Sequence, residues 1–137
     1  MTETTDQTAA AWQSEQIAWQ RVATTLLGKL LELAAKEHLP PINWTVVNVG
    51  ATLHGECIAY PAEPLRRDYF TSWRDAITAA TGTAPDSDRE TTTPGSEVRL
   101  MAHWDWVAIA LTSGRRDPAA HVTLTASFWP DEAEAGR

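Results

Sequence analysis

Apolar residues recur at spacings of three and four residues through the first third of the chain, which is the period of one face of an α-helix. This stripe runs from Trp19 to Leu33, and Trp12 falls near the same face two turns earlier. The pattern ends at Pro40, because the residue before a proline is pushed out of the α-helical region. We therefore predict one long helix that follows a polar, disordered segment over residues 1–8 and stops before Pro40.

Two stretches with the strand-like period of two follow this helix. Residues 42–49 and 52–60 are separated by a tight turn at Gly50 and Ala51, so we predict two strands here. The two faces of the second strand differ: Leu53, Gly55, Cys57 and Ala59 are small or apolar, and Thr52, His54, Glu56, Ile58 and Tyr60 form the other face. The small residues allow a helix to lie close. Gly28, in the long helix, predicts a similarly close approach of another backbone.

A second helical stripe begins at Pro64, because proline is favoured at the first position of a helix. Gly82 is suited to cap the end of this helix. Residues 83–96 have the composition of a loop, in which Thr91 to Thr93 could add a short edge strand.

The last third of the chain alternates again, and the predicted strands cover residues 98–104, 106–112 and 121–129. Two possibilities stay open around Asp105: the chain turns there, or residues 98–112 form one long bent strand. We predict a single domain over residues 1–137 with a frayed tail at 130–137. The order α-β-β-α-β-β-β predicts an α+β two-layer sandwich: an antiparallel sheet of four to five strands with both helices on one face.

Charge and composition narrow the class of protein. The net charge is −7 and the eleven basic residues are scattered, whereas nucleic-acid-binding proteins usually carry a basic stripe. No apolar run approaches the roughly 18 residues of a membrane span, and we find no signal peptide. The single cysteine, Cys57, excludes an internal disulfide, and we expect it to act as a small hydrophobe. We therefore expect a cytoplasmic protein that binds neither nucleic acid nor membrane.

Three segments carry a resemblance: LPPINWTV at 39–46, GATLHGEC at 50–57 and FTSWRDAI at 70–77. Together with the Thr-rich closing strands, they resemble small uncharacterised α+β proteins of high-GC bacteria with an αββαββ-like order. This resemblance implies the fold predicted above, and it implies no activity, cofactor or site residue.

Phosphate-loop, dinucleotide-binding, HExxH, paired CxxC and GxSxG motifs are absent from the sequence, which argues against the common motif-bearing enzymes. His54 and Glu56 are two residues apart and share a strand face, as do His103 and Asp105. If these faces coincide, His54, Glu56, His103 and His121 could form a metal or acid–base site. The alternative is that they are solvated positions on an open sheet face, and we predict no metal and no cofactor.

Seven tryptophans are more large anchors than the core of one small domain requires. We assign to the core Trp44, Trp73 and one of Trp104 and Trp106. Trp12 and Trp129 lie near the chain ends and are predicted to be exposed anchors. The open sheet face adds three further candidates for an interaction surface, Ile58, Tyr60 and Met101.

These features favour a non-enzymatic, acidic protein-binding module of the immunity, inhibitor or mobile-element accessory type. A homodimer is one form of it, in which the open sheet faces meet or Trp12 and Trp129 reach across. The alternative is a small-molecule-binding protein or an enzyme, with a pocket between helices and sheet that uses His54, Glu56 and His103.

Overall fold

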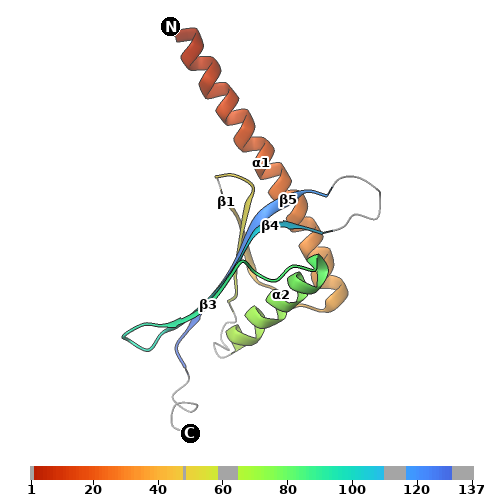
Figure 1. Cartoon of the computed structure of the whole chain (residues 1–137), viewed down its shortest axis with the longest axis vertical. Helices are drawn as coiled ribbons and strands as arrows, with labels where there is room; N and C mark the ends of the chain where they lie inside the picture. The colour runs from red at the N-terminus through yellow and green to blue at the C-terminus, as the bar shows by residue number, and fades with distance from the viewer. Residues whose placement is uncertain (1, 48, 59–64, 110–116, 131–137) are drawn as a thin grey trace.

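The computed structural model describes residues 2–47, 49–58, 65–109 and 117–130. Two helices and five strands follow one another in the predicted order (Figure 1). They are α1 (Thr2–Glu37), β1 (Asn43–Val47), β2 (Thr52–Glu56), α2 (Leu65–Thr81), β3 (Ser87–Thr92), β4 (Val98–Ala108) and β5 (Ala119–Phe128). The predicted α+β class and the order of its elements are confirmed.

The strands form one sheet in the order β1-β2-β5-β4-β3, so the last strand of the chain lies in the middle of the sheet. Every neighbouring pair is antiparallel except β2 and β5, which run parallel. The expected antiparallel sheet is therefore a mixed one. The parallel pair follows from topology, because the chain passes through α2, β3 and β4 before it returns as β5 beside β2.

Both helices pack on one face of this sheet, which we call the covered face. From α1, Ala23, Leu26 and Leu30 are completely buried, and from α2, Phe70, Trp73 and Ile77 are buried. Alternate residues of β5 meet them. The indole N–H of Trp73 donates to the carbonyl of Pro40 at 2.7 Å, so the polar atom of this core residue is satisfied. The prediction that both helices pack on one face of the sheet is confirmed: Leu26, Leu30 and Trp73 are buried there, and Tyr69 is partly buried against them.

Two glycines show how closely the layers approach. A Cβ at Gly55 would lie 2.9 Å from a methyl group of Leu124 and 2.9 Å from the ring of Trp44, so a side chain has no room there. The expectation for Gly28 is wrong, because a Cβ at this position would meet nothing within 4 Å. Gly28 lies on the exposed side of α1.

The ends of several elements differ from the prediction. Helix α1 begins at Thr2, where we expected disorder through residue 8, and it ends at Glu37. His38 follows with a φ of 55°, and the amide of Leu39 donates to the carbonyl of Ala34, which closes the last turn. Strand β3 covers Ser87–Thr92 and is longer than the edge strand we expected.

Four predicted features lie at the edge of the described residues or outside them. Ile58 lies two residues beyond the last residue of β2 and is half-buried. Tyr60, Pro64 and most of the tail at 130–137 lie outside the described residues.

Candidate functional site

The sheet has a second face, opposite the helices, which we call the open face. Alternate residues of the three central strands form it: Thr52, His54 and Glu56 of β2, His121, Thr123, Thr125 and Ser127 of β5, and Arg99, Met101, His103 and Asp105 of β4. The strand register arranges these side chains in rows, and one row crosses from His54 through Thr123 to His103. The predicted faces therefore coincide.

A bulge in β4 shapes one end of the open face. Trp104 pairs with Val122, and the next pair is Val107 with Ala120, so two residues of β4 lie opposite His121. These two residues, Asp105 and Trp106, are both exposed, whereas Trp104 and Val107 are buried. The question that the sequence left open is answered: β4 is one continuous, irregular strand over Val98–Ala108.

The bulge brings three potential metal ligands together, which we call the His–Asp cluster: His103, Asp105 and His121. One ligand atom from each lies within 4.8 Å of the others. Nε2 of His103 is 3.1 Å from Oδ1 of Asp105. The imidazole rings of His103 and His121 lie nearly parallel with centroids 6.1 Å apart. The indole of Trp106 packs on His121 with ring centroids 4.1 Å apart.

Neighbouring groups hold the cluster in place. Oγ1 of Thr123 lies 2.7 Å from Nδ1 of His103, and this hydrogen bond fixes the ring so that Nε2 faces Asp105. The carboxylate of Asp86 accepts a hydrogen bond of 2.7 Å from the amide of Asp105, in the bulge itself. Both the ring of His103 and the backbone of Asp105 are therefore restrained from outside the cluster.

The predicted group of His54, Glu56, His103 and His121 divides between two places. His103 joins His121, whereas Nε2 of His54 lies 2.7 Å from Oγ1 of Thr125. Because β5 separates β2 from β4, the backbones of His54 and His103 are ~10 Å apart.

Sequence reasoning paired Asp105 with His103 but treated Trp106 as a candidate for the core. Trp106 is instead 60% exposed, and Trp104 is the core residue. The signal was available in the sequence, because the alternation of apolar and polar residues breaks at this point.

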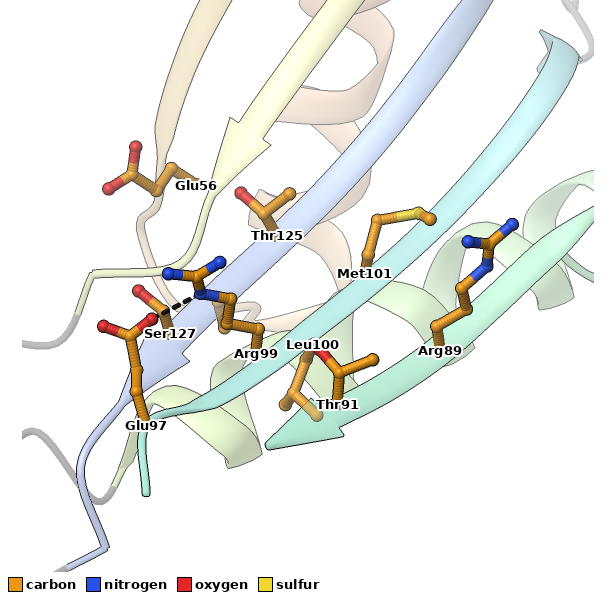
Figure 2. Close-up of a pocket in the computed structure, with 10 residues that line it drawn as sticks. Glu56, Arg89, Thr91, Glu97, Arg99, Leu100, Met101, Thr125 and Ser127 are labelled. Carbon is orange, nitrogen blue, oxygen red and sulfur yellow. Dashed lines mark hydrogen bonds and ion pairs between the residues drawn. The ribbon is translucent and has the colours of Figure 1, made fainter. Parts of the chain in front are cut away.

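Glu56 lies in a shallow hollow at the other end of the open face (Figure 2). Its charged lining residues are two arginines and two glutamates: Arg89, Arg99, Glu56 and Glu97. The guanidinium of Arg99 is paired with the carboxylate of Glu97, and Nε of Arg89 donates to Ser87. Met101 adds an apolar side chain to the floor. The balanced charges favour neither an anion nor a cation here.

A second hollow lies between the C-terminal halves of α1 and α2, and Lys29 lines it. The Lys29 ammonium donates to the carbonyl of Ile109 at 3.1 Å. Trp44 and Trp73 meet edge to face elsewhere, with ring centroids 5.3 Å apart, and neither hollow is lined by them. A cavity lined by Trp44, Trp73 and Tyr69 would favour the small-molecule alternative, and none of the three lines either of these two hollows.

The N-terminal half of α1 is a different kind of surface. Figure 1 shows this part of the helix extending beyond the sheet. We call residues 8–22 the α1 arm, because the complete burial of the stripe begins at Ala23. Trp12 is 51% exposed, and its ring meets that of Trp19 edge to face at 6.3 Å. The arm thus carries apolar side chains that this chain does not cover.

Trp129 is as exposed as Trp12, as expected, but its surroundings differ. A Cβ at Gly95 would lie 3.5 Å from the Trp129 ring, so this indole rests on the turn between β3 and β4. Trp129 therefore packs on a turn distant in sequence, whereas the ring contact of Trp12 is with Trp19 of the same helix.

Cys57 lies at the end of β2 on the covered face, and its thiol is buried. Burial, together with the smaller effect of the nearby Glu56 carboxylate, raises its pKa from 9.0 to about 12. The thiol therefore stays protonated at neutral pH, which is the opposite of what a nucleophilic cysteine needs.

Comparisons with protein-family models, with curated proteins and with solved structures found no match for this chain. Among the described residues, neither helix combines the length and the apolar character that crossing a bilayer requires. The open face and the α1 arm are therefore the surfaces of this chain that bear on its function.

Proposed function

We propose that this chain is a non-enzymatic protein-binding module and that its docking segment is the α1 arm. The partner that binds this arm is a second copy of the chain. The observation that carries the proposal is the extension of the apolar face of α1 beyond the part of the helix that the sheet buries. The residues that meet the sheet, Ala23, Leu26 and Leu30, are completely buried. The same helix face continues backward to Trp19, which packs on the edge of the core, and then past the polar Gln16 to Trp12, which is half exposed.

The arm is suited to pair with itself. Apolar residues at alternating spacings of three and four form a seam against which another helix can pack. Under a two-fold axis that crosses the arm, two antiparallel helices bring Trp12 of one copy near Trp19 of the other. Electrostatic repulsion does not oppose the pairing of two arms, because each arm contains one acidic residue, Glu15, and one basic residue, Arg21. The net charge of −7 is carried by other parts of the chain.

The size of the arm limits the affinity. A short helical contact falls at the lower end of protein interfaces, below about 1,200 Å² in total, where association is weak. We therefore expect a dissociation constant of roughly 10–100 μM, which corresponds to about −5.5 to −7 kcal/mol. Aromatic anchors at the centre of such a contact carry most of this energy.

Sedimentation velocity over a concentration range that brackets this constant tests the proposal. We expect the unmodified chain to pass from monomer to dimer, and Trp12→Glu to stay monomeric throughout. Trp12 is half exposed, so this variant should keep the circular dichroism spectrum of the parent chain.

Two variants serve as matched controls. Ile17→Glu changes a residue of the same helix that is 58% exposed and lies off the stripe. Trp129→Glu changes an indole that is as exposed as Trp12 but follows β5. Both should dimerise like the unmodified chain. A monomer at every concentration, or equal loss of the dimer in Trp129→Glu, would overturn the assignment to the arm.

A further inference from the structure

The His–Asp cluster has the ligand types and the spacing of a metal site. In a tetrahedral zinc site with bonds of about 2.0–2.1 Å, neighbouring ligand atoms are ~3.3 Å apart. Nε2 of His103 and Oδ1 of Asp105 are already 3.1 Å apart. A ring nitrogen of His121 lies within 4.8 Å of one ligand atom of each of the other two residues. Small side-chain rotations, which move these atoms by about 1.5 Å or less, are therefore sufficient to bring the three to ligand spacing.

A simple surface ion pair between His103 and Asp105 does not explain the whole arrangement. Such a pair has no need of His121, yet the bulge in β4 places His121 opposite Asp105 and Trp106. Among the described residues, the ring nitrogens of His121 have no hydrogen-bond partner, and the ring is held by its contact with Trp106. Its nitrogens therefore stay available to a ligand.

The surroundings of the cluster match those of histidine ligands in metal sites. A metal-binding histidine usually has its second ring nitrogen held by a hydrogen bond, which fixes the orientation of the ring. Thr123 supplies this bond to Nδ1 of His103 and leaves Nε2 for the metal. Asp86 fixes the backbone of Asp105, and Trp106 limits the rotation of His121. Each of the three ligands is thus restrained by a group that is not itself a ligand.

From these observations we propose that the His–Asp cluster is a binding site for a divalent transition-metal ion. Two imidazoles and one carboxylate suit zinc, cobalt or nickel, whereas magnesium and calcium prefer sites made of oxygen alone. Three protein ligands leave a fourth position, which faces solvent because Asp105 is exposed and both histidines are half-buried. The site is therefore open to a water molecule or to a group from a partner.

Isothermal titration of the untagged, chelator-treated chain with zinc chloride tests the proposal. We expect one zinc ion per chain with a dissociation constant in the micromolar range. His121→Ala and Asp105→Asn should each weaken binding at least tenfold. In cobalt-loaded protein, the visible absorption of four-coordinate cobalt should appear with the unmodified chain and disappear in both variants.

His54→Ala is the matched control, because His54 lies in the same row of the open face but is bonded to Thr125 outside the cluster. It should bind zinc like the unmodified chain. Circular dichroism should be the same for all variants, since none of the changed side chains belongs to the core. Absence of zinc binding, or retention of full affinity in His121→Ala, would overturn the proposal. An equal loss in His54→Ala would do so too, because it would place the ion elsewhere on the face.

Discussion

The covered and open faces are formed by the same strands, but different physical constraints decide which residue types each face carries. On the covered face of β4 and β5, large apolar residues such as Trp104 and Leu124 fill the space beneath the helices. On the open face, the alternate positions of the same strands carry His103, Thr123 and Thr125. The covered face is determined by packing, whereas the chemistry of the open face depends on which strands lie side by side. Stability should therefore depend mainly on the first face.

The largest difference in the free energy of unfolding should separate alanine variants of two adjacent leucines of α1. Leu30 is completely buried on the covered face, whereas Leu31 is 52% exposed. We expect Leu30→Ala to lower the free energy of unfolding by about 2–5 kcal/mol, because it leaves a cavity. Leu31→Ala should change it by less than about 0.5 kcal/mol. Urea denaturation measures both, and similar losses for the two leucines would contradict the assignment of the covered face.

Two glycines give the next contrast. Gly55→Ala forces a methyl group against Leu124 and Trp44, and overpacking of this kind costs about 1–3 kcal/mol. Gly28→Ala meets nothing within 4 Å and should stabilise α1 by up to about 1 kcal/mol. The two melting temperatures should therefore shift in opposite directions. If Gly28→Ala were destabilising, the open space on that side of α1 would be in doubt.

The smallest effect depends on pH and concerns Cys57. Burial raises the pKa of this thiol from 9.0 to about 12, so the unfolded chain releases the proton at a lower pH than the folded chain. Between these values the folded state binds more protons, and stability falls as pH rises. We expect the unmodified chain to lose more stability than Cys57→Ala between about pH 8 and pH 10. Parallel urea titrations of both proteins would show equal losses if the thiol were not shielded.

The periodic parts of the fold could be predicted from the sequence, because they depend on local spacing. The stripe with Leu26 and Leu30 and the alternation around Leu53 identified the covered face correctly. The prediction for Gly28 was wrong because it did not use the helical phase: Gly28 stands two residues from both Leu26 and Leu30, so it lies on the side of the helix opposite their stripe. The early start of α1 was missed, since Thr-rich composition outweighed the weak periodicity before Trp12.

The candidate sites could be predicted only in part. The sequence indicated that His103 and Asp105 share a face, but the approach of His121 depends on the register between β4 and β5 and on one bulge. Neither is determined by residues near in sequence. The residues predicted to form an interaction surface on the open face are separated for the same reason. Met101 lines the polar hollow, and Ile58 lies beyond the end of β2. The open face is therefore more polar than we expected.

The position of β5 has a consequence for the order in which this chain can fold during synthesis. Strand β5 leaves the ribosome after the other four strands of this sheet, although it is the middle strand, and it joins residues as distant as His54 and Thr125, which are 71 positions apart. Until β5 has emerged, β2 and β4 each have an unpaired edge. Contacts of such high sequence separation slow folding and prolong exposure of these edges. The nascent chain should therefore gain its native sheet only after β5 has emerged.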